Sequence, residues 1–413
     1  MTSTNIYQDI AARTGGDIYI GVVGPVRTGK STFIKQFMDC LVLPNITEDY
    51  QKERANDELP QSSSGRTIMT TEPKFIPEKG VEIKIDNTAA MNVRLIDCVG
   101  YIVPSALGYI EGDQPRMVHT PWFEDPIPFN MAAEIGTQKV ITEHSTIGLV
   151  VTTDGTITEL DRADYVDAET RVIDELKAIN KPFIIVLNST SPESAAATEL
   201  KNELSEKYDV PVVAVNCEHL SPGDIHNIIE TVLFEFPLSE INIDVPAWLE
   251  ALPPEHQLKS DIYAAVIENM QDIYKIRDTR RLCNGLSGCR FIGSADTEGI
   301  DLGQGTVKMK IALPRSLFYQ VLGEQSGFEI SDEESLITLM AELGKMKKEY
   351  DKISYALHEV REKGYGIVSP STDELTLDEP KIVKQGGRFG VRLRASAPSI
   401  HMTCNKPKFL KTA

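Results

Sequence analysis

The chain has 413 residues, of which 41% are hydrophobic, and this length is enough for two or three domains with a sizeable core. Its net charge of -19 argues against a nucleic-acid-binding protein, because such a surface repels phosphates on average. The six cysteines have the spacing of neither a disulfide framework nor a zinc site, so we expect reduced thiols. The sequence shows no signal-peptide segment and no apolar run of about 18 residues, so we expect no membrane span.

The first 240 residues alternate between expected strands and helices. A short apolar run at 17–23 predicts a buried strand, and the helical spacing of apolar residues over 31–41 predicts an amphipathic helix. Buried β-branched strands separated by helices predict a mostly parallel sheet with helices on both faces, which is an α/β domain over residues 1–240. The further expected strands lie at 81–85, 93–96, 147–151, 183–187 and 212–215.

Two segments interrupt this alternation. The polar stretch 47–64 is expected to be a mobile loop. The stretch 100–139 contains five prolines, and we expect a long ordered insertion or a lid there.

Prolines cluster over 237–254, which predicts a domain boundary. Beyond it we expect a smaller α+β domain over residues 241–402, with a helix at 258–280, antiparallel strands within 290–311 and a long helix at 331–363. An apolar stripe on the long helix is expected to pack against its own domain, with a subunit interface as the alternative. The stripe comprises Leu336, Leu339, Met340, Leu343, Met346, Tyr350 and Ile353.

The strongest chemical signal is the segment from Gly24 to Ser31, which matches G-x-x-x-x-G-K-[ST] between a predicted strand and a predicted helix. Glycines allow the backbone to wrap a phosphate, and the loop amides and the positive helix end hold its oxygens. Lys30 is expected to reach the β- and γ-phosphates and Ser31 to bind Mg²⁺. The expected nucleotide-binding residues are Gly24, Arg27, Thr28, Gly29, Lys30, Ser31 and Thr32, together with Gly100 of the next motif.

A second motif follows the strand predicted at 93–96. There an aspartate, Asp97, precedes Gly100 by three residues, as in the Walker B and D-x-x-G arrangement of translation-factor-like P-loop NTPases. We expect Asp97 to hold Mg²⁺, through water, and the Gly100 amide to meet the γ-phosphate. The alternative is a strand-end aspartate that only caps a helix.

Threonines between the first helix and the strand pair lie where this class keeps its first switch. Thr70 and Thr71 are the candidates that sense the γ-phosphate, with Thr67 third. The alternative is threonines with ordinary strand propensity. The expected catalytic residues are thus Lys30, Asp97, Thr70 and Thr71, and the expected Mg²⁺ ligands are Ser31, Thr70 and Asp97.

The base-recognition motif N-K-x-D is broken. After the strand at 183–187 the chain reads Asn188-Ser-Thr-Ser, without the lysine or the guanine-binding aspartate, so ATP is expected rather than GTP. Position 101 is Tyr101 instead of a water-positioning glutamine or histidine, so hydrolysis should be slow or assisted. Either Arg27 or Arg66 could supply charge to the transition state.

Longer segments resemble the stage IV sporulation protein A family over roughly residues 1–402. They include GVVGPVRTGKSTFIKQFM, SSGRTIMTTEPKFIP, RLIDCVGY, ELKAINKPFIIVLNS and FGVRLRASAPSIHM. The resemblance implies ATP hydrolysis coupled to self-assembly into the basal layer of the bacterial spore coat. It also implies a mother-cell location at the outer forespore surface, and partners that include a small amphipathic membrane-bound peptide and other coat proteins.

The tail over residues 403–413 departs from the family's continuation, so we expect the family's C-terminal domain to be absent. Three function classes follow from the sequence. They are an ATPase whose hydrolysis drives polymerisation, a regulatory GTPase resembling ribosome-assembly factors, and a scaffold with a vestigial nucleotide pocket. The intact Lys30, Ser31 and Asp97 count against the last of these.

Overall fold

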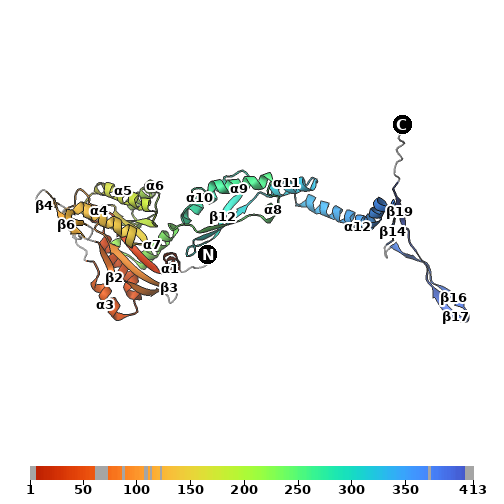
Figure 1. The fold of residues 1–413 in the computed structure, drawn as a ribbon, viewed down its shortest axis with the longest axis horizontal. Helices are drawn as coiled ribbons and strands as arrows, with labels where there is room; N and C mark the ends of the chain where they lie inside the picture. Colours follow the sequence, from red (N-terminus) through yellow and green to blue (C-terminus); the bar gives the residue numbers. More distant parts are fainter. Residues whose placement is uncertain are drawn as a thin grey trace, which may run out of the picture. The chain divides into compact units, whose positions relative to one another are not determined.

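The structure is a computed structural model that describes residues 6–60, 73–85, 89–106, 110–111, 114–120, 123–370 and 374–404. The chain divides into two compact units, Met1–Leu313 and Pro314–Ala413. Figure 1 colours the chain from red at the N-terminus to blue at the C-terminus and labels many of its helices and strands.

The first unit is built on a six-stranded sheet with the strand order β10-β9-β8-β1-β3-β2. Strand β1 (Asp17–Val23) pairs in parallel with β3 (Ala89–Asp97) on one side and with β8 (Ile147–Thr153) on the other. Only β2 (Lys74–Ile85) runs antiparallel, against β3. The mostly parallel sheet predicted from the sequence is therefore confirmed. Strands β9 (Phe183–Asn188) and β10 (Val212–Val215) complete it.

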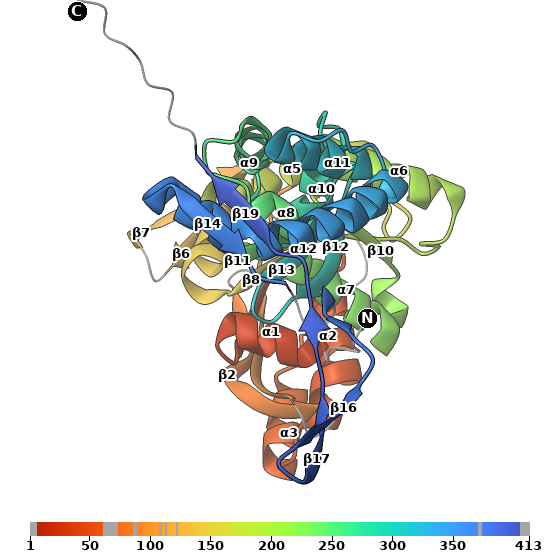
Figure 2. The same ribbon diagram turned by 90° about the vertical axis from the view of Figure 1, so that its right-hand side faces the viewer.

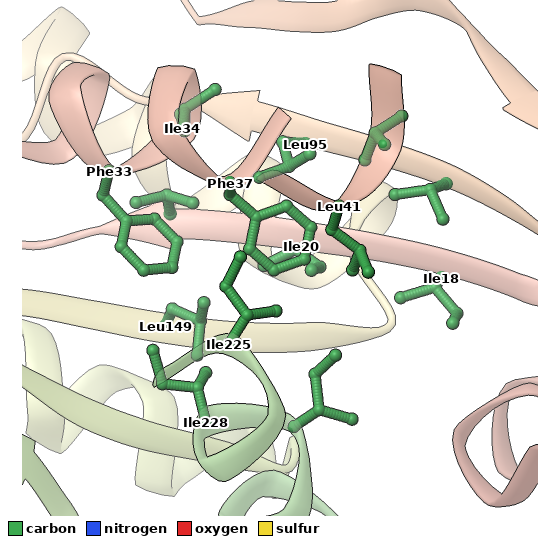
Figure 3. Close-up of a cluster of buried hydrophobic side chains, with 14 of the residues drawn as sticks. Ile18, Ile20, Phe33, Ile34, Phe37, Leu41, Leu95, Leu149, Ile225 and Ile228 are labelled. Atoms are coloured by element: carbon green, nitrogen blue, oxygen red, sulfur yellow. The ribbon is translucent and has the colours of Figure 1, made fainter. Parts of the chain in front are cut away.

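Helices cover both faces of this sheet, because successive strand residues such as Val22 and Val23 are buried in two different hydrophobic clusters. Figure 3 shows Phe33 and Phe37 packed near Ile20 and Leu149 in one of them. Helices α1 (Ile6–Thr14), α2 (Lys30–Phe37) and α7 (Pro222–Phe234) supply the first cluster. Helices α4 (Phe129–Lys139), α5 (Arg162–Ile179) and α6 (Ala195–Tyr208) supply the second.

Within the segment expected to be a mobile loop, the structure forms a helix, α3 (Asp49–Asp57). That part of the prediction is wrong, because Ala55 is buried in the core and Arg54 pairs with Glu58 one turn on. The described part of the predicted insertion holds four short strands and α4. The strands are β4 (Ile110–Glu111), β5 (Gln114–Pro115), β6 (Met117–Thr120) and β7 (Phe123–Pro128). Short 3-10 or π-helical turns lie at Met38–Val42, Leu43–Asn45, Val140–His144, Cys217–His219 and Ile276–Asp278.

A three-stranded sheet completes the first unit, in the order β11-β13-β12. Its antiparallel pair confirms the strands predicted within 290–311. The helix predicted at 258–280 is instead two helices, because the Asp278 carboxylate accepts the amides of Tyr274 and Lys275 and closes a turn between them. These elements are β11 (Glu240–Asp244), α8 (Ala247–Glu250), α9 (Gln257–Asn269), α10 (Thr279–Ser287), β12 (Ser294–Asp301) and β13 (Thr306–Ala312).

The second unit contains the long predicted helix, α12 (Glu333–Lys363), which starts at a capping box of Asp332 and Ser335. Met346 and Tyr350 of its apolar stripe are 63% and 57% exposed, so the predicted packing against its own domain is wrong for them. The other elements are α11 (Arg315–Ser326), β14 (Tyr365–Val368), β15 (Thr376–Leu377), β16 (Lys381–Gln385), β17 (Arg388–Arg392), β18 (Ala395–Ser396) and β19 (Ile400–Thr403). The strands pair as β14-β19, β15-β18 and β16-β17.

Candidate nucleotide site

The loop between β1 and α2 has the backbone that its glycines predict. Gly24 has a φ of 135°, and a Cβ there would lie 2.2 Å from the carbonyl oxygen of Val151. Thr28 braces the turn by donating its hydroxyl to the Pro25 carbonyl at 3.0 Å. A side chain at position 24 would therefore push the loop off β8, and only glycine fits.

Lys30 is the first residue of α2, and its side chain is buried within this loop. Its ammonium donates to the carbonyls of Pro25 at 2.7 Å and Gly24 at 3.4 Å. Burial lowers the pKa of Lys30 to about 8, although Asp97 opposes that shift. A buried cation with two neutral acceptors and one nearby carboxylate is a strong attractor for phosphate.

Ser31 and Asp97 meet beside the lysine. The Ser31 hydroxyl donates to Oδ2 of Asp97 at 2.6 Å. Burial raises the pKa of Asp97, and its Oδ1 is buried with no hydrogen-bond partner among the described residues. Hydroxyl and carboxylate oxygens are the ligands that Mg²⁺ prefers, and a carboxylate oxygen left unsatisfied is what an absent cation leaves behind. The pair therefore fits Mg²⁺.

The second motif lies directly against the loop, because β3 is the parallel neighbour of β1. The Tyr101 amide donates to the Gly24 carbonyl at 3.2 Å, and the Val26 amide donates to the Tyr101 carbonyl at 2.8 Å. Gly100 is so close that a Cβ would lie 2.4 Å from Nζ of Lys30. The structure thus brings Gly24, Lys30, Ser31, Asp97 and Gly100 together, as the sequence predicted.

Tyr101 itself has a different role from the residue it replaces. Its side chain is buried, its hydroxyl hydrogen-bonds to Glu175 of α5, and the Arg171 guanidinium lies 5.6 Å from its ring centroid. Burial and the Glu175 hydrogen bond raise the pKa of Tyr101. The hydroxyl therefore anchors the strand end to α5 and cannot orient a water molecule while this bond is kept.

Asn188, where the guanine-recognition motif is broken, contacts the phosphate loop directly. Its Nδ2 donates to the Thr28 carbonyl at 3.0 Å, and its Oδ1 accepts the Cys217 amide at 3.0 Å. It is buried at the end of β9 and joins the phosphate loop to the segment after β10. The only sequence signal was its place directly after a predicted strand.

Other predicted residues divide into two groups. Arg27 belongs to the loop with a φ of 66°, and burial lowers its pKa. Thr32 is half-buried in the first turn of α2. The candidates Arg66, Thr67, Thr70 and Thr71 all lie within 61–72, outside the described residues.

Two kinds of feature do not occur among the described residues. No group of three or more His, Cys, Asp and Glu side chains that could hold a metal ion occurs in that part of the chain. No helix in it is long and apolar enough to cross a membrane.

Two family models together match nearly the whole chain. The family model "Stage IV sporulation protein A, ATPase domain" matches residues 1–237, and the "middle domain" model of the same name matches residues 238–406. Proteins called stage IV sporulation protein A in Clostridioides difficile strain 630, Bacillus anthracis and Bacillus subtilis strain 168 are 51%, 50% and 50% identical to the chain. Each match covers 97% of this chain and 82% of the relative.

Proposed function

The chain belongs to the stage IV sporulation protein A family and is an ATPase of sporulation, and from this premise we propose that it binds ATP with Mg²⁺ and couples hydrolysis to self-assembly into the basal layer of the spore coat. The observation that carries the nucleotide part is the cluster of Lys30, Ser31 and Asp97. In it a buried ammonium, a hydroxyl and a half-satisfied carboxylate converge at one loop.

Each residue has a defined task in this proposal. Lys30 exchanges its two loop carbonyls for the β- and γ-phosphates, and Ser31 and Asp97 place the metal that neutralises them. The Gly100 amide meets the γ-phosphate, and Thr70 and Thr71 sense it. Asn188 positions the loop and acts through Thr28. When bound, Mg²⁺ supplies charge stabilisation to the transferred phosphoryl group.

The fold class belongs to the same proposal. The second motif follows the strand next to β1, and β2 runs antiparallel at the edge. Both features, together with the D-x-x-G spacing, support the translation-factor-like class. ATP is preferred to GTP because no aspartate follows Asn188 at the guanine-binding position.

Location and partners are further parts of the proposal, and they rest on family membership. We place the protein in the mother cell at the outer forespore surface. There it contacts further copies of itself, other coat proteins and a small amphipathic membrane-bound peptide. The P-loop ATPase domain is proposed to span residues 1–240, and the α+β domain residues 241–402.

The test is sedimentation of the chain with Mg²⁺ and either ATP, GTP or a non-hydrolysable ATP analogue, with phosphate release measured in the same samples. We expect sedimenting assemblies and phosphate release in the sample with ATP and Mg²⁺, and neither in the samples with GTP or the analogue. Lys30→Ala serves as the control that cannot use nucleotide. Equal assembly with GTP, or assembly with ATP that occurs without phosphate release, would count against the proposal.

A further inference from the structure

Charge is distributed very unevenly along the chain. From Lys381 to Ala413 there is no Asp or Glu, and there are eight Lys and Arg. The preceding 380 residues carry 34 Lys and Arg against 61 Asp and Glu, a net charge of -27. A basic segment of this kind on an acidic protein is typical of a contact surface for an acidic partner.

Five of the eight cations belong to one hairpin and its exit, and the hairpin has an exposed apolar face. In the ladder of β16 and β17, Ile382 is opposite Val391 and Lys384 is opposite Phe389, so these four side chains share a face. Ile382, Phe389 and Val391 are 77%, 74% and 66% exposed. The cations are Lys381, Lys384, Arg388, Arg392 and Arg394.

The hairpin lacks internal support. It is a two-stranded sheet of its own, visible as a separate ribbon in Figures 1 and 2, and such an isolated hairpin is at best marginally stable in water. Lys381 lies directly opposite Arg392, which places like charges across the ladder. None of the five cations forms an ion pair with another described residue. A partly apolar surface with negative charge would support the isolated hairpin, offset the repulsion between Lys381 and Arg392, and pair with the five cations.

The same unit offers such a surface at the start of α12. A groove of about 440 Å³ is lined by four carboxylates, two hydroxyls and one leucine. The positive helix end accounts for acidic residues in the first turn but not for Glu342, which lies two turns further on. The lining residues are Glu329, Asp332, Glu334, Ser335, Thr338, Leu339 and Glu342.

The groove and the start of β14 lie far apart along α12. The groove is centred near Ser335, whereas Gly366 of β14 packs against the backbone of Ala356 on the same helix. Those two helix positions are roughly 30 Å apart at the rise of an α-helix. Two complementary surfaces that lie apart on one subunit form a head-to-tail contact, which repeats from copy to copy and can build an open assembly.

We propose that the β16–β17 hairpin of one copy docks into the groove at the start of α12 of a second copy, with Lys384 facing Glu334 and Glu342, the apolar face covering Leu339, and Arg388 adding positive charge beside the turn. This contact rests on the proposed self-assembly and gives it a surface. It is an electrostatic contact between copies, so it does not itself require nucleotide.

The test is a charge exchange in the full chain, followed by sedimentation velocity over a range of protein concentrations with and without ATP and Mg²⁺. Lys384→Glu with Arg388→Glu reverses the hairpin, and Glu334→Lys with Glu342→Lys reverses the groove. Each reversed protein alone should associate at least ten-fold more weakly than the wild type. An equimolar mixture of the two should regain association to within about three-fold, because both reversed and both native surfaces then find partners.

A matched control is Lys52→Glu with Lys177→Glu, which makes the same charge change on two exposed residues of the first unit and should leave association unchanged. All variants should keep wild-type phosphate release per chain, since none touches the nucleotide loop. Reversed proteins that associate like the wild type, or a mixture that does not recover, overturn the contact.

Two further outcomes separate this contact from its alternatives. Association that depends on the hairpin but is the same with and without ATP supports the contact and contradicts ATP-driven assembly. A chain that is monomeric at every concentration overturns both the contact and ATP-driven assembly. Binding to phosphatidylglycerol vesicles that the hairpin reversal abolishes, with self-association unaffected, would assign the hairpin to a membrane surface and overturn the contact between copies.

Discussion

At the scale of single residues, we expect Lys30 to hold the phosphate, because among the described residues its buried ammonium donates only to loop carbonyls, with the Asp97 carboxylate nearby. Charge-assisted contacts to phosphate contribute about 1.5–3 kcal/mol each. We therefore expect Lys30→Ala to weaken ATP binding by about ten-fold to a hundred-fold in a direct titration. Lys35→Ala, on the exposed side of the same helix, is the control, and an unchanged affinity for Lys30→Ala would contradict the P-loop assignment.

The lowered pKa of Lys30 makes a second prediction, for the chain without nucleotide. Between pH 8 and 10.5 the unfolded chain keeps this proton and the folded chain has lost it, so the folded state gains stability as pH rises through that window. The gain is on the order of 3 kcal/mol. The free energy of unfolding of the wild type, measured against Lys30→Met at each pH, should rise accordingly. A constant difference from pH 8 to 10.5 would show that the folded pKa is not lowered.

Asp97 and the two threonines should separate binding from turnover. Asp97 accepts a hydrogen bond from Ser31, the proposed metal ligand, and not from the backbone of the phosphate loop, so Asp97→Ala should reduce phosphate release far more than ATP affinity. The same is expected for Thr70→Ala with Thr71→Ala, if these residues sense the γ-phosphate. Single-turnover hydrolysis and equilibrium binding measure the two effects. A variant that hydrolyses ATP at the wild-type rate would contradict the role proposed for its substituted residues.

The sequence could predict those site residues whose spacing is local. The loop from Gly24 to Ser31 is contiguous, and Asp97 and Gly100 arrive beside it because parallel neighbours end at the same edge of a sheet. The contacts of Asn188 could not be predicted, because they join Thr28 to Cys217, which are distant in sequence. The inward direction of Tyr101 likewise depends on Glu175, which no local pattern reveals.

At the scale of elements, α12 shows the limit of reading a helix from its apolar spacing. The pattern correctly predicted the helix, but not what the stripe packs against, since the buried residues of α12 are Ala356 and Val360 at its far end. The spacing shows which face of a helix is apolar but does not show which surface packs against that face. The turn between α9 and α10 was missed for a related reason, because Asp278 closes it through backbone amides rather than through glycine or proline.

The exposure of the stripe gives an element-scale prediction. Met346→Ser with Tyr350→Ser should change the free energy of unfolding of the monomer by about 0.5 kcal/mol or less, because neither side chain is buried. Val360→Ala removes buried methyl groups and should cost about 1–2 kcal/mol. Denaturant titration at low protein concentration measures both. A large loss for the Met346 and Tyr350 pair would show that they are covered by their own chain.

At the scale of the whole molecule, the α/β domain is joined to the three-stranded sheet that follows it through Glu235. Its buried carboxylate lies 2.8 Å from Lys275 and 2.9 Å from Arg277, and burial raises its pKa. Arg277 also reaches the exposed Asp209. The boundary predicted near 237–254 is therefore crossed by a buried ionic cluster, which explains why the first compact unit continues to Leu313.

Removing that carboxylate should loosen the first unit. Glu235→Ala leaves the partly exposed Lys275 and Arg277 without their buried partner, which should cost about 1–3 kcal/mol. Asp209→Asn removes only an exposed charge, keeps a residue that tolerates the positive φ of this position, and should cost less than about 1 kcal/mol. Thermal unfolding of both variants measures the difference. Equal melting temperatures would mean that the cluster does not hold the two parts together.

The central place of β1 also sets the order in which the chain can fold while the ribosome makes it. Strand β1 can pair with β3 as soon as residue 97 has emerged, but its other edge waits for β8, which ends at Thr153. Translation at about 5–20 residues per second leaves that apolar edge without its neighbour for several seconds. During this interval a newly made chain presents the interior of its own sheet to other chains, and slower translation of the stretch between the two strands lengthens that exposure.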